Sequence, residues 1–313
     1  MLIPRRIISE NEYLLVQVTS TKMCPDCCKY EKVLDEFNTK VLKSTNSSLF
    51  KHNIKLARAD YQEGGWFADD YDVPMLPYLL FIIKGKTLYF KDPKDLNRVA
   101  INLERHIEPI VELHSMRMVQ DFLKGTVKDI SGRVLVRSKA LCLISDKDDF
   151  EEILEEYHKT ALLMSWREDM AFGLVSRVKI IKEIRKEYGT KFFPDSFDLN
   201  AVAIYRNKNR FEDADQVVLL DMTSNKVKSV GRWIAENSLG AVEELNSLNE
   251  GAYSIALPIL IAFCEPRKQA ETDNFLRGYR NLAKYYEREI NFVWVDFNDN
   301  LNLMKRLGVF RCE

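Results

Sequence analysis

Short apolar runs alternate with segments of helical spacing along most of the 313-residue chain. Runs of roughly four to eight apolar residues predict buried strands, and apolar positions three or four residues apart predict helices. In the first third, strands are predicted at residues 13–18, 54–60, 78–83 and 87–90, and helices at residues 30–37 and 96–107, with a shorter helix just before residue 73. This order predicts an α/β domain over residues 1–108 that ends in a hairpin and a helix.

Pro109 interrupts the helical pattern, and a second series of elements begins at residues 110–113. Strands are predicted at residues 140–144, 161–165, 201–205 and 216–220, and helices at residues 115–124, 148–160, 178–188 and 227–236. Strands and helices that alternate in this way are expected of a sheet covered by helices. We therefore expect a second domain over residues 109–237.

A third series starts near residue 238 and repeats the beginning of the first. It has a strand at residues 257–263, a helix at 273–288, a strand at 290–295 and a short helix at 300–307. The first series continues into a hairpin at this point, whereas the third reaches residue 313 without one. We expect an incomplete domain over residues 238–313. Because a bare strand edge is unfavourable, we expect either a longer parent chain or a partner protein that supplies the missing strands.

Composition narrows the class of protein but does not identify it. Hydrophobic residues make up 46% of the chain and charged residues 30%, as in an ordinary globular protein. The net charge of −1 gives no reason to expect nucleic acid or an anionic membrane as partner. No apolar run approaches the roughly 20 residues of a membrane span. The first six residues are too short and too charged for a signal peptide, so we expect either a cytosolic chain or one whose signal has been removed.

The most informative motif is Cys24-Pro25-Asp26-Cys27, which follows a predicted strand and a loop and precedes a predicted helix. Two thiols at this spacing can form and open a disulfide. A helix N-terminus favours the thiolate, the species that attacks disulfides. Half of a zinc site has the same spacing, but the chain has neither a second Cys-x-x-Cys nor a spaced histidine pair. The motif therefore favours redox chemistry over metal binding.

The order strand, Cys-x-x-Cys, helix, strand, helix, proline, hairpin, helix resembles the thioredoxin superfamily. Three such units in tandem, with a redox motif only in the first, resemble the protein disulfide isomerase family. The resemblance implies tandem α/β domains, each a mixed central sheet flanked by helices, with the third incomplete. It also implies that the first domain carries out thiol exchange, while the domains without the motif bind client polypeptides or other protein partners.

The resemblance also implies the roles of individual residues. Cys24 would be the attacking thiolate, and Cys27 would resolve the mixed disulfide. Pro77 matches the family's cis-proline and, with its neighbours Leu76 and Tyr78, would position the substrate backbone. No cofactor is required, because the electrons stay on sulfur.

Several positions depart from the family pattern. Gln17 stands where the family has a buried acid, so it can form hydrogen bonds but cannot take a proton from Cys27. A carboxylate introduced there is expected to be buried without a partner. Asp26 should raise the pKa of the thiol and oppose the helix terminus, although the Pro25-Asp26 dipeptide also occurs in a small cytosolic thioredoxin-related family.

Other departures concern bulk and the remaining thiols. Met23 replaces the usual tryptophan, and Tyr78 replaces the common threonine. Cys28 should point away from the redox pair, because consecutive helical residues lie about 100° apart, and we expect it to be packed. Cys264, which follows a predicted strand, is expected to be a core cysteine.

Two functional hypotheses follow from these residues. The first is a thiol–disulfide oxidoreductase or isomerase that acts on protein disulfides through Cys24 and Cys27. The alternative is a non-catalytic scaffold or chaperone that retains the fold and binds protein partners. The resemblance implies the endoplasmic reticulum lumen as the compartment, with the cytoplasm as the alternative.

Overall fold

The structure is a computed structural model, and it describes residues 5–20, 22–62, 65–73, 75–90, 93–124, 138–145, 150–165, 167, 169–192, 200–206, 216–221, 229–240, 242–245, 258–265, 269–286, 289–298, 304–305 and 308–309. The chain divides into two compact units, and the second unit begins at Pro109. Both units are built from sheets flanked by helices, so the predicted α/β fold class is confirmed.

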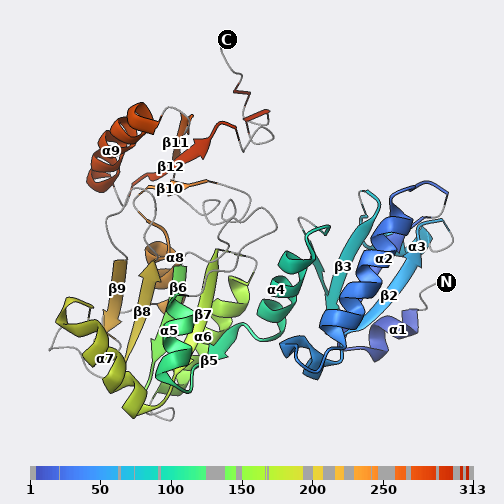
Figure 1. The fold of residues 1–313 in the computed structure, drawn as a ribbon, viewed down its shortest axis with the longest axis horizontal. Coiled ribbons are helices and arrows are strands. Elements are labelled where there is room, and N and C mark those ends of the chain that lie inside the picture. Colours follow the sequence, from blue (N-terminus) through green and yellow to red (C-terminus); the bar gives the residue numbers. More distant parts are fainter. Residues whose placement is uncertain are drawn as a thin grey trace. The chain divides into compact units, whose positions relative to one another are not determined.

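The first unit contains a four-stranded sheet with the order β2-β1-β3-β4 (Figure 1). Its elements are α1 (Arg5–Glu10), β1 (Tyr13–Thr19), α2 (Cys27–Phe37), β2 (Lys55–Asp60), α3 (Gly65–Asp70), β3 (Tyr78–Ile83), β4 (Lys86–Tyr89) and α4 (Leu96–Ile107). A π-helical turn (Asn38–Leu42) and a 3-10 helix (Ser48–His52) lie between α2 and β2. β1 pairs in parallel with β2 and antiparallel with β3, and β3 and β4 form the predicted hairpin.

β1 is buried on both faces, as the central strand of a sheet between helices must be. Leu15 packs on one face in a cluster with Leu34 of α2 and Leu103 of α4. On the opposite face, Val16 belongs to a cluster with Phe67 of α3. Because side chains alternate along a strand, residue 17 lies on the same face as Leu15, under α2.

The second unit begins with a five-stranded sheet of order β5-β7-β6-β8-β9. Its strands are β5 (Ile110–Glu112), β6 (Ser138–Leu143), β7 (Met170–Val175), β8 (Ala201–Arg206) and β9 (Gln216–Asp221), and its helices are α5 (Met116–Lys124), α6 (Glu151–Leu163), α7 (Val178–Phe192) and α8 (Val230–Asn237). Tyr157 of α6 and Ile234 of α8 share one core cluster. Leu123 of α5 and Ile181 of α7 share another. Helices therefore cover both faces of this sheet too.

The strand predicted at residues 161–165 is wrong, because residues 161–163 complete α6. The strand is β7, whose apolar sequence contains Gly173. A Cβ atom on Gly173 would lie 3.0 Å from side-chain atoms of Leu113 and Phe122, so close packing over this strand requires the small residue. Leu162 and Leu163, the last two residues of α6, are apolar but exposed. Their apolar character led to the wrong prediction of a buried strand.

The second unit also contains a three-stranded parallel sheet of order β10-β12-β11. Its elements are β10 (Glu243–Glu244), β11 (Ile259–Cys264), α9 (Gln269–Tyr285) and β12 (Asn291–Asp296). The order first-third-second is also that of β5, β7 and β6. In the described part of the chain, β11 is an edge strand of this sheet. The short helix predicted at residues 300–307 lies largely outside the described residues.

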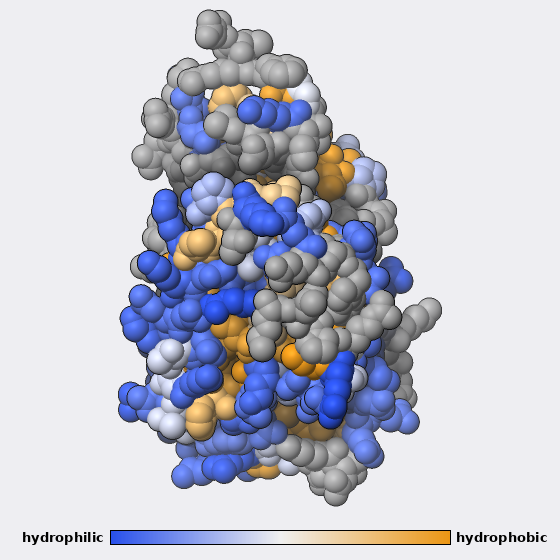
Figure 2. Space-filling model, turned by 90° about the vertical axis from the view of Figure 1, so that its right-hand side faces the viewer, coloured by the Kyte–Doolittle hydropathy of each residue, from blue (hydrophilic) through white to orange (hydrophobic). Residues whose placement is uncertain are grey.

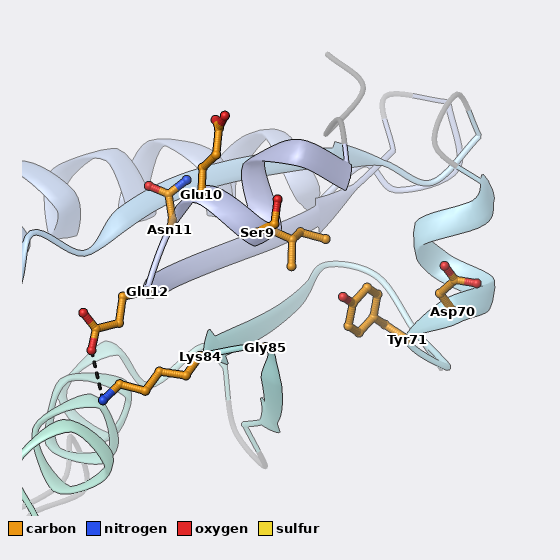
Figure 3. Close-up of a pocket in the computed structure, with 9 residues that line it drawn as sticks. Ser9, Glu10, Asn11, Glu12, Asp70, Tyr71, Lys84 and Gly85 are labelled. Carbon is orange, nitrogen blue, oxygen red and sulfur yellow. Dashed lines mark ion pairs between the residues drawn. The ribbon is translucent and has the colours of Figure 1, made fainter.

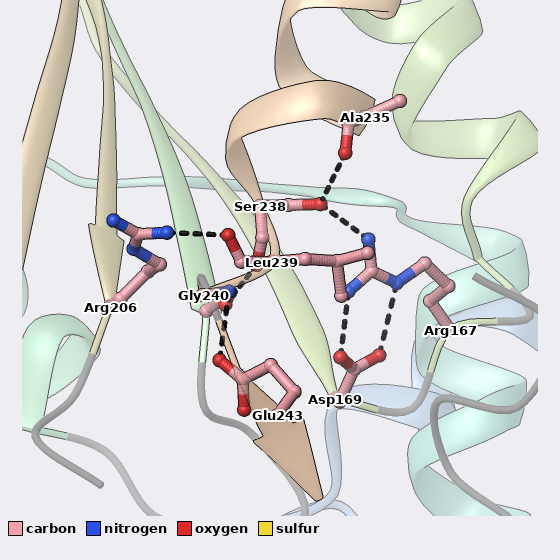
Figure 4. Close-up of polar contacts among 9 residues, drawn as sticks. Arg167, Asp169, Arg206, Ala235, Ser238, Leu239, Gly240 and Glu243 are labelled. Carbon is pink, nitrogen blue, oxygen red and sulfur yellow. Dashed lines mark hydrogen bonds and ion pairs between the residues drawn. The ribbon is translucent and has the colours of Figure 1, made fainter. Parts of the chain in front are cut away.

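A buried polar network lies between the five-stranded sheet and the chain that leads to β10 (Figure 4). Arg167 donates from Nε and Nη2 to the two carboxylate oxygens of Asp169, at 3.1 and 2.7 Å, and from Nη1 to Ser238 Oγ. Arg206 of β8 donates to the carbonyl of Leu239. The Arg167 and Asp169 side chains are 3% and 9% exposed, so their charges compensate each other out of water.

No helix in the described part of the chain combines the length and the apolar character that crossing a bilayer requires.

We expect Asp169→Ala to destabilise the second unit by about 3–5 kcal/mol, because it removes the carboxylate that forms two hydrogen bonds with the buried Arg167 guanidinium. Glu236→Ala is the control, since it removes an exposed pair with Arg232 that should contribute at most about 1 kcal/mol. Urea unfolding of the full chain measures both free energies. Equal losses in the two variants would contradict a structural role for the buried pair.

Candidate functional site

Cys24 and Cys27 form a disulfide with an S–S distance of 2.10 Å and a Cα–Cα distance of 5.3 Å. Cys27 is the first residue of α2, and its N–H donates to the carbonyl of Cys24 at 3.1 Å. Cys24 is 6% exposed and Cys27 is completely buried. Both cysteines are therefore buried, Cys24 slightly less than Cys27, and the pair lies where the first N–H groups of α2 have no partner within the helix.

Pro25 and Asp26, the two residues between the cysteines, are exposed. Asp26 is the N-cap residue of α2, but its side chain forms no capping hydrogen bond. It lies 3.7 Å from Lys29, which is also largely exposed. Water and the lysine screen its charge, so its opposition to the thiolate is weaker than the sequence alone suggests.

The Leu76–Pro77 peptide bond is cis, as the sequence resemblance implies. Pro77 is buried and directly precedes β3, while Leu76 and Tyr78 are half-buried. Tyr78 is paired with Val18 near the end of β1, from which the loop to Cys24 departs. This register places the Pro77 segment and the cysteine loop at the same end of the sheet.

Gln17 is completely buried in the face of β1 that lies under α2. Its Oε1 accepts a hydrogen bond from Arg58 Nε at 3.1 Å, and Arg58 Nη2 lies 2.6 Å from Asp35 Oδ1 of α2. Its Nε2 has no hydrogen-bond partner. A carboxylate at position 17 would therefore meet Arg58, so the expectation that it would lack a partner is wrong.

Thr19 and Glu31 form a second link between β1 and α2, which sequence reasoning missed. Thr19 Oγ1 donates to Glu31 Oε1 at 3.0 Å, and both side chains are partly or fully buried. Glu31 is four residues after Cys27, so the two side chains lie on the same face of the helix. The sequence contains this spacing, but only the position of Thr19 shows that Glu31 points toward the sheet.

The free cysteines divide into one exposed and two buried thiols in the described part of the chain. Cys28 is exposed whereas Cys27 is buried, so the expectation that Cys28 would be packed is wrong. Cys264 is buried, as expected of a core cysteine. Burial raises the pKa of the Cys142 thiol, and burial together with Asp296 raises the pKa of Cys264 to about 11.

Exposed methionines occur at the disulfide end of the first unit. Met23 precedes Cys24 and is 62% exposed, and Met75 lies two residues before Pro77 and is 66% exposed. Sequence reasoning noted Met23 only as a substitution, and it missed Met75. The one sequence signal for Met75 is its position between Pro74 and Pro77. The face in Figure 2 likewise carries apolar residues among a largely hydrophilic surface.

A hollow of about 760 Å³ lies at the opposite end of the first sheet (Figure 3). Glu12, before β1, and Lys84, in the hairpin turn, form an ion pair of 3.1 Å across part of it. Lys84 lowers the pKa of Glu12. No cysteine lines this hollow, which is therefore separate from the disulfide.

Residues 195–311 match the family model of a thioredoxin-like domain. Among solved structures, human ERp44 in crystal form II is 15% identical, with a TM-score of 0.45, and the match covers 97% of this chain and 74% of that chain. The bb fragment of ERp72 is 17% identical, with a TM-score of 0.43, and the match covers 66% and 81%. Full-length ERdj5 is 14% identical, with a TM-score of 0.32, and the match covers 99% and 41%. No curated protein matches the chain.

The matched residues 195–311 include β8 and β9 of the five-stranded sheet and all of the described β10-β12-β11 sheet. In the first unit, the disulfide at the start of α2 and the cis-proline before β3 match the resemblance found in the sequence. The family model thus identifies a thioredoxin-like domain in residues 195–311, and the first unit carries the cysteine and proline pattern that resembles the same superfamily.

Proposed function

We propose that the protein is a thiol–disulfide oxidoreductase of the disulfide isomerase type, acting on protein disulfides through Cys24 and Cys27. The observation that carries the proposal is the Cys24–Cys27 disulfide, which lies at the start of α2 and at the same end of the sheet as Pro77. Two cysteines that can pair in this position can also accept electrons from dithiols or donate them to disulfides. No cofactor takes part in this exchange.

The difference in burial supports different roles for the two thiols. Cys24 is the less buried of the two cysteines, and its thiolate is stabilised by the N-terminus of α2, so it attacks the substrate disulfide. This step forms a mixed disulfide and releases one substrate thiolate. Cys27 then attacks Cys24 Sγ, which restores the internal disulfide and releases the second thiolate. The two electrons pass from the cysteine pair to the substrate.

Leu76, Pro77 and Tyr78 form the proposed substrate contact. They precede or begin β3, next to the end of β1 and the loop that carries Cys24. An extended client peptide at this position would pass close to the attacking sulfur. Met23 and Met75 are exposed and flexible in side chain, which suits contacts with varied apolar sequences in a client.

A non-catalytic scaffold or chaperone is the second candidate, and Gln17 favours it. The side chain under α2 is neutral where the family has a buried acid, and it is hydrogen-bonded to Arg58. Without a proton acceptor there, the internal disulfide would turn over slowly. Under this alternative the cysteines remain paired, and the exposed methionines bind protein partners.

We propose that thioredoxin-like domains over residues 109–237 and 238–313 bind client polypeptides, as the resemblance implies. The edge position of β11 in the described sheet suits a stable protein partner that adds strands to the third domain. The proposed compartment is the endoplasmic reticulum lumen, with the cytoplasm as the alternative.

Cys24→Ser should abolish reduction of a model protein disulfide, whereas Cys28→Ser should retain most of the activity. Cys24 is half of the disulfide, and Cys28 is an exposed thiol outside it. Turnover of an insulin-type substrate with dithiothreitol as reductant measures both effects. Similar losses in the two variants would show that the roles are wrongly assigned, and no turnover in the unmutated protein would favour the scaffold.

Gln17→Glu should be tolerated in the unmutated background, because Arg58 would pair with the new carboxylate. In an Arg58→Met background, the same change should reduce the free energy of unfolding by about 3–5 kcal/mol, since the buried charge then has no partner. Urea unfolding of Gln17→Glu, Arg58→Met and the double variant gives the comparison. An equal effect of Gln17→Glu in both backgrounds would show that Arg58 does not pair with position 17.

The compartment can be tested at Asn46, which begins the sequence Asn46-Ser47-Ser48 and lies exposed in a turn. This is a glycosylation acceptor sequence for a chain that enters the secretory pathway. Expression in a eukaryotic cell should then give a band that shifts after glycosidase treatment, and Asn46→Gln should abolish the shift. A chain that lacks the shift and fractionates with cytosolic proteins would contradict the lumenal assignment.

A further inference from the structure

The buried position of Cys27 raises a question about its proton. To resolve a mixed disulfide, Cys27 must lose the proton of its thiol, and its side chain is completely buried. Direct transfer to bulk water is therefore obstructed. Gln17 cannot serve, because an amide does not accept a proton near neutral pH, and its oxygen already accepts a hydrogen bond from Arg58.

Glu31 brings a carboxylate to the same side of α2 as Cys27. Side chains four residues apart on a helix are neighbours, with Cβ atoms about 5–6 Å apart. Glu31 is turned toward β1, where Thr19 Oγ1 donates to its Oε1 at 3.0 Å. Thr19 is buried and Glu31 is half-buried, so this contact draws the carboxylate toward the sheet side of the helix.

The other charged and titratable groups near this layer can be placed from the same contacts. On α2, Asp35 pairs with Arg58, and Cys28 is exposed. On β2, Arg58 forms contacts with Gln17 and Asp35. Asp60 lies opposite Thr19 in the β1–β2 pairing, and its carboxylate accepts a hydrogen bond from the backbone N–H of Gln62. Asp26 is next to Cys27 in the chain, but its side chain is exposed and lies 3.7 Å from exposed Lys29. Asp35 lies two helical turns from Cys27. Glu31 on α2 and Asp60 on β2 are therefore the candidate carboxylates on the sheet side of the helix.

We propose that Glu31 is the proton acceptor for Cys27 in the resolution step, in place of the acid that is absent at position 17. This inference rests on the proposed thiol–disulfide exchange. The Cys27 S–H proton passes to the Glu31 carboxylate, and the Cys27 thiolate attacks Cys24 Sγ. The Cys24–Cys27 bond forms as the bond from Cys24 to the substrate sulfur breaks. The substrate thiolate leaves and takes up a proton from Glu31 or from solvent.

The same geometry acts in the opposite direction. When a substrate thiolate attacks Cys24 of the oxidised protein, Cys27 is the leaving group and needs a proton. The acid form of Glu31 supplies it, as microscopic reversibility requires. Thr19 is a positioning residue in both directions, because it holds the carboxylate near Cys27 without contact with the reacting sulfurs.

Single-turnover kinetics with Ellman's reagent test the proposal on the reduced 313-residue chain. Cys28, which is exposed, and Cys312, which lies outside the described residues, are both replaced by serine. Attack by Cys24 releases the first coloured thiolate, and attack by Cys27 releases the second in a phase that does not depend on reagent concentration. We expect Glu31→Gln to leave the first phase unchanged and to slow the second by 10-fold or more at pH 7. Glu31→Asp should restore part of the rate.

The pH profile separates proton transfer from a loss of structure. With Glu31 present, the rate of the second phase should be nearly independent of pH around neutrality, because the proton stays within the protein. In Glu31→Gln it should rise about tenfold per pH unit, because hydroxide must then remove the proton. The amide of Gln still accepts the hydrogen bond from Thr19, so the helix contact is retained.

Two further variants serve as controls. Glu36→Gln removes one negative charge from the exposed side of the same helix, where Glu36 pairs with Lys40, and should leave both phases unchanged. Asp60→Asn tests the other nearby carboxylate. A second phase in Glu31→Gln with the unmutated rate and pH profile would overturn the proposal, as would transfer of the whole effect to Asp60→Asn. Absence of the first phase in the parent protein would instead overturn the proposed function itself, and the inference with it.

Discussion

The geometry of the disulfide site depends on the burial of β1 between two layers of helices. The strand must be apolar on both faces over most of its length, and four of its seven residues are completely buried aliphatic side chains. Once α2 packs against Leu15, the start of the helix is fixed relative to the end of the strand. The loop between them then holds Cys24 beside the sheet end at which Pro77 enters β3.

Polar residues in the same layer face the constraint that buried hydrogen-bonding groups need partners. Arg58 reaches from β2 to both Gln17 and Asp35, and Thr19 reaches Glu31. These contacts connect two strands and the helix through side chains rather than through the backbone ladder. The Gln17 amide nitrogen is the exception among them, since it is buried without a partner. These side-chain contacts fix the position of α2 on the sheet. They also place the positively charged Arg58 and the negatively charged Asp35 and Glu31 in the layer between α2 and the sheet.

Much of the fold was predictable because its strands are continuous apolar runs bounded by turns. The hairpin around Lys84 and the cysteine pair before α2 follow directly from such patterns. β7 was predicted at the wrong residues, because Gly173 interrupts its apolar pattern. A glycine is required there by the close packing of Leu113 and Phe122 over the strand.

The candidate site was predictable in its cysteines and its proline, which have local signatures. The contacts of Arg58 and Glu31 were not, because they depend on which residues of β1, β2 and α2 share a face after packing. Cys28 shows the limit of a helical spacing argument. The direction of its side chain followed from the spacing, but its exposure depended on what covers that side of α2.

The order of strands has a consequence for the chain during its synthesis on the ribosome. All four strands of the first sheet lie between Tyr13 and Tyr89, so this sheet can close once Tyr89 has left the ribosome. In the described part of the chain, β5 pairs with β7 and β10 pairs with β12, and all of these strands are made after the first sheet. Each of these edge strands emerges before its partner exists, and its sheet can close only after the intervening strand and helices have been made. The cysteine pair can therefore be folded and open to oxidation while the strands that complete the later sheets are still being translated.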